Sequence, residues 1–275
     1  MRILGVDFTS RPRRGKPIVC AEAELLQGRL AVAALREIAD FGAFEALLAE
    51  PGPWVGGFDF PFGQPRALIE QFGWPLEWRA YVEQAARLSR EQFRALMDGV
   101  RTARPPGAKY LHRATDRPAG ASSPMKLVNP PVALMFYEGA PRLARSGACV
   151  IPCCNGDTTR IVLEAYPGML ARQIANASYK NDAKSKQTPA RLAARRRIRD
   201  GLVGDCARRF GFALELFPAV SRAAIEDAGG DALDAVLCAV QAAWACSRAR
   251  SGYGIPAGAD PLEGWIVGPA AVGVR

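Results

Sequence analysis

The chain has 275 residues, of which 49% are apolar, so it is long enough to bury a full core without disulfide bonds. Its formal net charge of +9 favours polyanionic partners such as nucleic acids or nucleotides. One histidine excludes a multi-histidine metal site, and seven irregularly spaced cysteines make a poor disulfide framework. We expect a soluble protein of the reducing cytoplasm, because neither a signal peptide nor a membrane-length apolar run is present.

The first part of the chain predicts a strand, a hairpin, a helix and another strand. Residues 2–8 are mostly apolar, as in a buried strand. Residues 18–25 and 29–34 alternate around a turn signal, and residues 40–49 have the pattern of a short helix. A further strand follows at 54–60. We expect this last strand to run parallel to the first, since a helix connects it to the hairpin.

A long segment over 65–148 then interrupts the strand pattern. Residues 76–99 have helical periodicity, whereas 101–131 are rich in proline, glycine, serine and arginine and resemble a loop. We therefore expect one domain over 1–275, with 65–148 as a helical and loop insertion over one face of the sheet. The role of this insertion, in substrate or partner recognition, stays open. His112 lies in the loop, where a solvated histidine is expected.

The last part of the chain alternates between strands and helices. Residues 148–168 predict a hairpin that turns at Asn155-Gly156 and continues as a strand to Glu164. Two helices are then expected at 167–177 and 188–210, the second being basic and bent or broken between Gly201 and Gly204. The strongest helical pattern follows these elements and covers 231–248. The terminal segment LEGWIVG is expected to add a short strand.

Three predicted strands end in an acidic residue, at Asp7, Asp59 and Glu164. If these strands run parallel, their carboxyl ends share one edge of the sheet, where ligands of open α/β sheets bind. The helix over 231–248 is apolar nearly all round except for a narrow stripe that includes Asp231 and Asp234. Carboxylates gathered in this way favour a hard divalent cation such as Mg²⁺ or Mn²⁺.

Each acid also has a structural explanation when it is taken alone. Asp231 and Asp234 could cap the helix and interact with its dipole. Asp7 and Asp59 could begin turns, and Glu164 could form an ion pair with one of the many arginines. The metal hypothesis depends on all five acids together.

The short motifs GVDFTS, GGFDFPFG, LEAYPG, DALDAVLCAVQA and the terminal EGWI together resemble the DUF429 family of predicted ribonuclease H-like nucleases. The helix DALDAVLCAV is also similar to the last helix of RuvC-type Holliday-junction resolvases. The resemblance implies a ribonuclease H-like mixed sheet: three strands able to pair antiparallel, then parallel strands, with helices on both faces. It also implies Asp7, Asp59 and Asp234 as metal ligands, with Glu164 and Asp231 as additional ones.

The function implied is a nuclease that hydrolyses phosphodiester bonds in DNA or RNA with Mg²⁺ or Mn²⁺. Asp7, Asp59, Asp234 and Glu164 would be the catalytic acids. Candidates for binding phosphate or nucleic acid flank the first strand and the segment SYKNDAKSK. They are Thr9, Ser10, Arg11, Lys180 and Lys184.

Two other functions remain open. GVDFTS also resembles the first phosphate loop of actin-like and sugar-kinase phosphotransferases, but those enzymes need a duplicated core and the chain contains no repeat. A non-catalytic nucleic-acid-binding module would explain the positive charge. It would give no reason for the acidic cluster.

Overall fold

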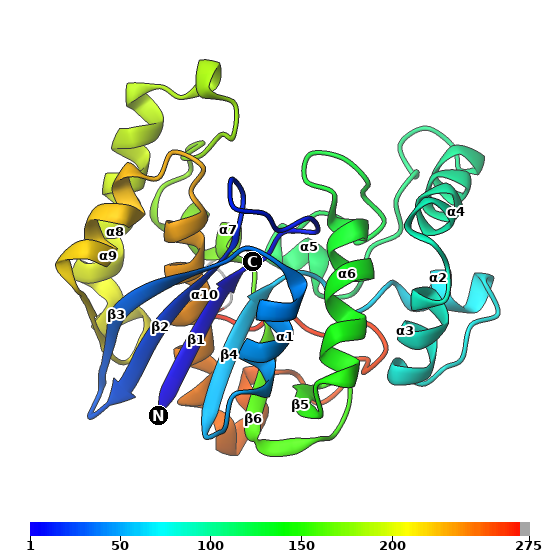
Figure 1. Cartoon of the computed structure of the whole chain (residues 1–275), viewed down its shortest axis with the longest axis horizontal. Helices are drawn as coiled ribbons and strands as arrows, with labels where there is room; N and C mark the ends of the chain where they lie inside the picture. The colour runs from blue at the N-terminus through cyan, green and yellow to red at the C-terminus, as the bar shows by residue number, and fades with distance from the viewer. Residues whose placement is uncertain (270–275) are drawn as a thin grey trace.

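In a computed structural model of the chain, which describes residues 1–269, seven strands form one mixed sheet (Figure 1). The strand order is β5-β6-β4-β1-β2-β3-β7. β2 is antiparallel to both β1 and β3, whereas β1, β4, β6 and β5 are parallel to one another and β7 is parallel to β3. This confirms the predicted fold class. The strands are β1 (Arg2–Asp7), β2 (Ile18–Leu26), β3 (Arg29–Ile38), β4 (Trp54–Asp59), β5 (Ala148–Ile151), β6 (Asp157–Glu164) and β7 (Ala213–Leu216).

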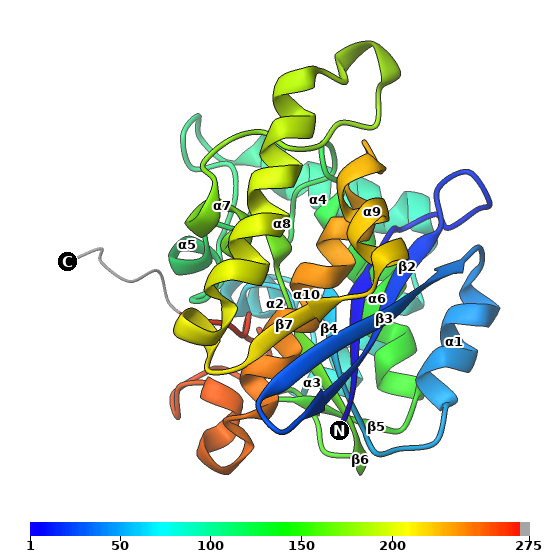
Figure 2. The same ribbon diagram turned by 90° about the vertical axis from the view of Figure 1, so that its left-hand side faces the viewer.

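Helices cover both faces of this sheet. α10 lies across β1, β2 and β4 on one face, with α7, α8 and α9 beside it, while α1 and α6 cover the other face (Figures 1 and 2). Each face buries its own apolar cluster. The helices are α1 (Phe41–Ala49), α2 (Arg66–Gln71), α3 (Trp78–Ala86), α4 (Arg90–Ala103), α5 (Asp116–Ala119), α6 (Val132–Arg145), α7 (Pro167–Ile174), α8 (Pro189–Phe210), α9 (Pro218–Glu226) and α10 (Asp231–Cys246), with short 3₁₀ helices η1 (Lys184–Lys186) and η2 (Ala249–Gly254).

Two glycines let α10 approach the sheet closely. A Cβ on Gly5 of β1 would lie 2.1 Å from the carbonyl oxygen of Ala235, and one on Gly57 of β4 would lie 2.6 Å from that of Cys238. No larger residue fits at such distances. The first half of α10 is therefore held directly against the ends of β1 and β4, and this contact positions the site.

The predicted hairpin over 148–168 is wrong. β5 and β6 pair in parallel, with Val150 opposite Val162. The chain turns at Pro152 and doubles back so that Cys154 forms an antiparallel bridge with Val150, and Asn155-Gly156 lies within this return. The turn signal was real, but it connects the return segment to β6 instead of joining two antiparallel strands.

The expected break in the basic helix is also absent, since α8 is one continuous helix through Gly201 and Gly204. Gly201 serves packing: a Cβ there would lie 2.4 Å from the side chain of Ile174 in α7. The terminal segment forms no full strand within residues 1–269. Its only pairing there is an isolated parallel bridge between Glu164 and Ile266.

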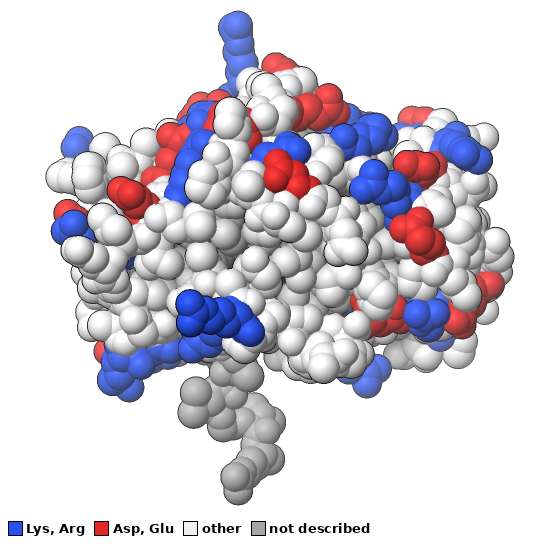
Figure 3. Space-filling model, turned by 90° about the horizontal axis from the view of Figure 1, so that it is seen from below, with Lys and Arg blue, Asp and Glu red and all other residues white. Residues whose placement is uncertain are grey.

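The segment 65–148 contains α2 to α6. Its helices α2, α3, α4 and α6 belong to the apolar cluster on the face opposite α10, whereas Ala119 of α5 belongs to the cluster on the α10 face. Figure 3 shows the molecule from below, where β1, β4 and β6 begin; the middle of this face carries few charged side chains. Asp7, Asp59 and Glu164 lie at the other end of these strands. None of the helices in the described part of the chain has the length and apolar character needed to cross a bilayer.

Candidate functional site

Asp7 and Asp59 end neighbouring parallel strands and are direct partners in the register of β1 and β4. Side chains alternate along a strand, and Gly5 and Gly57, two positions earlier, both face α10. Asp7 and Asp59 therefore point to the α10 face, on strands that lie about 4.8 Å apart. Asp7 is only 8% exposed. The ends of two strands thus bring two carboxylates side by side under a helix.

Asp234 lies in the first turn of α10, fully buried. The hydroxyl of Tyr179 donates to its Oδ1 over 2.6 Å, and the ammonium of Lys180 binds its Oδ2. Both residues belong to the segment between α7 and α8. Arg195 of α8 holds this segment by donating to the carbonyl oxygen of Tyr179 over 2.7 Å. The segment therefore delivers one hydroxyl and one cation to the acids.

Asp231, the first residue of α10, is paired with a second lysine. The ammonium of Lys16, from the connection between β1 and β2, lies 2.8 Å from Oδ1 and 2.9 Å from Oδ2 of Asp231. The same ammonium lies 2.8 Å from Asp182. Gly230, with φ of 83°, is the N-cap in place of either aspartate. Asp231 thus lies at the rim of the acidic cluster, linked by Lys16 to the segment that carries Lys180.

The charges within the cluster perturb one another. Burial and the nearby carboxylate of Asp234 raise the pKa of Asp7 well above its usual range. Burial raises the pKa of Asp59 to about 7, with Lys180 opposing and Asp234 and Glu164 reinforcing the shift. Burial lowers the pKa of Lys180, but Asp234 and the other neighbouring anions raise it by more. A shared environment of this kind is typical of functional sites.

Glu164 lies on the other face of the sheet. Its register partner in β4 is Phe58, which packs on Phe44 of α1, so the pleat directs Glu164 away from α10. There the guanidinium of Arg113 binds both carboxylate oxygens, at 2.6 and 2.8 Å, and the backbone N–H of Phe62 donates over 3.0 Å. Burial raises the pKa of Glu164 although Arg113 opposes the shift. The structure thus brings Asp7, Asp59, Asp234 and the rim residue Asp231 together, but pairs Glu164 with an arginine.

Arg113 and Lys16 were missed at the level of sequence. Arg113, 3% exposed, also binds Asp116 and donates to the carbonyl oxygen of Glu263 over 2.8 Å. It joins the loop before α5 to the end of β6 and to the terminal segment. Nothing in a loop rich in arginine distinguishes this arginine from its neighbours.

The residues predicted to bind phosphate have different environments. Lys180 lies in the cluster, with its side chain 43% exposed. The buried hydroxyl of Ser10 accepts from Arg90 over 3.1 Å, Thr9 is half-buried and Arg11 is exposed. The side chain of Lys184 lies outside the described part of the structure.

Asp7, Asp59 and Asp234 bring together carboxylate oxygens from three elements, and such oxygens are the ligands that hard divalent cations prefer. Among residues 1–269, no three histidine, cysteine or acidic side chains are arranged to hold one metal ion together. The ammonium of Lys180 binds Asp234 and neutralises part of the negative charge of the cluster. A metal ion held by all three aspartates would require this ammonium to move off Asp234.

The comparisons with known proteins bear on the family. No curated protein and no solved structure matches the chain. A family model described as a protein of unknown function, DUF429, matches residues 5–259 and so covers the end of β1 and all of β4, β6 and α10, which carry the acids. The chain belongs to the DUF429 family.

Proposed function

We propose that this protein is a nuclease that hydrolyses phosphodiester bonds with Mg²⁺ or Mn²⁺ bound by Asp7, Asp59 and Asp234. The observation that supports it most is the register of β1 and β4, which puts Asp7 beside Asp59 beneath α10. Like charges packed in this way disfavour ionisation unless cations neutralise them. Burial raises the pKa of Asp59 to about 7, and the neighbouring carboxylates of Asp234 and Glu164 add to this shift.

The chain's own residues have distinct tasks in this proposal. Asp7, Asp59 and Asp234 would hold the metal, and Asp231 would lie at its rim. A bound divalent cation supplies a water of lowered pKa and neutralises charge on the phosphate. Tyr179 fixes the orientation of the Asp234 carboxylate through its hydroxyl. Once released from Asp234, the ammonium of Lys180 would remain beside the site and bind a phosphate oxygen of the substrate.

The test is a cleavage assay on labelled single-stranded, duplex, branched and hybrid nucleic acids, with Mg²⁺, Mn²⁺ or EDTA. We expect cleavage of at least one substrate with metal, none with EDTA, and a loss of about a hundredfold or more in Asp59→Asn. Asp200→Asn is the matched control, because Asp200 has a 64% exposed side chain on α8 and makes its ion pair with Arg199.

Three results would contradict the proposal. They are cleavage that persists in EDTA, an Asp59→Asn variant as active as Asp200→Asn, and no cleavage of any substrate. ATP hydrolysis in the last case would favour the phosphotransferase alternative.

A further inference from the structure

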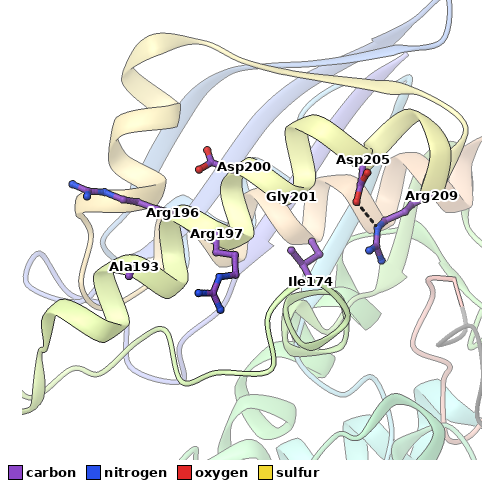
Figure 4. Close-up of a pocket in the computed structure, with 8 residues that line it drawn as sticks. All are labelled: Ile174, Ala193, Arg196, Arg197, Asp200, Gly201, Asp205 and Arg209. Carbon is purple, nitrogen blue, oxygen red and sulfur yellow. Dashed lines mark hydrogen bonds and ion pairs between the residues drawn. The ribbon is translucent and has the colours of Figure 1, made fainter.

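Two hollows in the described surface carry several basic side chains. The first lies between α7 and α8 and is lined by Ile174 of α7 and by Arg196, Arg197 and Arg209 of α8 (Figure 4). It also contains Asp200 and Asp205, and Asp205 pairs with Arg209 over 3.5 Å. These acids compensate much of its positive charge. The first hollow is therefore a poor anion site.

The second hollow is formed by the loop before α5 and has a volume of about 720 Å³. No acidic side chain lines it, while Arg104, Lys109, His112, Arg113 and Arg117 do. Arg113 is neutralised by Glu164 and Asp116. Lys109 and Arg117 are exposed and have no ion-pair or hydrogen-bond partner among residues 1–269. This basic hollow therefore presents uncompensated positive charge.

The basic hollow is anchored to the end of β6, the strand that neighbours the one ending at Asp59. Arg113, which lines it, binds Glu164 at the end of β6, and Glu164 pairs in register with Phe58, the residue before Asp59 in β4. Ala114 donates its backbone N–H to Glu263 over 2.9 Å, and Thr115 accepts from the backbone of Ile266 over 3.1 Å. A recognition site works best on such fixed support.

The shape and lining of the basic hollow indicate the kind of ligand. Its volume is within the range of about 300–1,000 Å³ that is typical of small-molecule sites, which suits one nucleotide unit. Half-buried Tyr110 lines it and offers an aromatic ring. Unpaired bases stack on aromatic rings while cationic side chains bind their phosphates. A paired base stays inside its duplex and does not enter such a hollow.

We propose that the basic hollow binds an unpaired nucleotide of the substrate strand, with Lys109 and Arg117 on its phosphates and Tyr110 against its base. This inference rests on the proposed function, because it gives the insertion a role in presenting single-stranded nucleic acid to the acidic cluster. It makes a single-stranded segment next to the cleaved bond the preferred substrate.

The test measures binding of a fluorescent single-stranded oligonucleotide by anisotropy in EDTA, where no cleavage interferes. Lys109→Ala/Arg117→Ala should weaken binding about tenfold or more, since each side chain makes a charge-assisted contact. The slope of log affinity against log salt should become shallower by about 1.4, the value for two lost phosphate contacts on a single strand. Tyr110→Leu should weaken binding without changing that slope.

The matched control is Arg222→Ala/Arg250→Ala, which removes the same charge from two exposed side chains that have no partner within residues 1–269. We expect it to bind like the parent, and the charge-preserving Lys109→Arg/Arg117→Lys to restore most of the affinity. Melting temperatures of the variants at Lys109, Arg117, Arg222 and Arg250 should match that of the parent, because these side chains are exposed. A double variant that binds like the control would overturn the inference, and so would a duplex that competes as well as the single strand.

Failure of this inference is distinguishable from failure of the proposed function. A protein that cleaves in a metal-dependent manner but binds equally well without Lys109 and Arg117 loses only the inference. One that binds single strands through these residues but never cleaves retains the binding site and loses the nuclease.

Discussion

The raised pKa of Asp59 predicts how the free energy of unfolding depends on pH. Its pKa of about 7 in the folded, metal-free protein lies above the 3.8 of an exposed aspartate, mainly because of burial. A raised acid pKa means that the folded state holds the proton more tightly, so the stabilising contribution is complete below about pH 4 and is lost as the pH rises through 7.

Asp59→Asn removes this titration. In EDTA, the free energy of unfolding of the parent should fall more steeply between about pH 4 and 7 than that of the variant. Urea denaturation across this range measures both, and Asp200→Asn should follow the parent. Equal losses in parent and Asp59→Asn would mean that the carboxyl of Asp59 is ionised throughout.

Arg113 should be far more important for stability than the other arginines of its loop. Its guanidinium is buried against Glu164 and Asp116, and removing it would leave two buried carboxyl groups without their cation. Arg113→Met should lower the free energy of unfolding by about 3–5 kcal/mol. Arg117→Met, four positions later and exposed, should change it by less than about 0.5 kcal/mol. Similar urea midpoints for the two variants would contradict this account of the buried pair.

At the scale of elements, the contact between α10 and β1 positions Asp234 over Asp7. Gly5→Ala places a methyl group against the backbone of Ala235 and Ala239, so it should push α10 outward and destabilise the fold by about 1–3 kcal/mol. It should also reduce the stabilisation that Mn²⁺ gives. Gly204→Ala is the control, because nothing lies within 4 Å of that Cβ and alanine favours the helix. A Gly5→Ala protein as stable as Gly204→Ala would show that the close contact is dispensable.

The elements also show what could be predicted from sequence. The strands ending at Asp7 and Asp59 follow from apolar runs, and their adjacency follows from the helix that joins them. β7 was not predicted, since it is a four-residue edge strand with half of its positions exposed. The parallel pairing of β5 and β6 was missed because a turn signal sets only local geometry.

The same limit applies to the site. A carboxylate at a strand end can be placed from sequence, because the register of parallel strands fixes its neighbours. The lysines that pair with these acids cannot be identified from the sequence. Lys16 reaches Asp231 across 215 positions of the chain, and only the folded arrangement brings the two together.

For the molecule as a whole, the clustered carboxylates of Asp7, Asp59 and Asp234 predict a response to metal. Mn²⁺ should raise the melting temperature of the parent, because a ligand of the folded state stabilises it by mass action. Asp7→Asn should be at least as stable as the parent in EDTA, since it relieves repulsion from Asp234, and should gain much less from Mn²⁺. Loss of stability in Asp7→Asn with an unchanged response to Mn²⁺ would make Asp7 a structural residue.

The central claim is that Asp7, Asp59 and Asp234 form one divalent-metal site. A crystal structure with Mn²⁺, phased to show its anomalous scattering, tests this most directly. We predict an anomalous peak bounded by the three carboxylates, with the ammonium of Lys180 moved off Asp234. A fully soaked crystal without a peak there, in which Lys180 still binds Asp234, would contradict the claim.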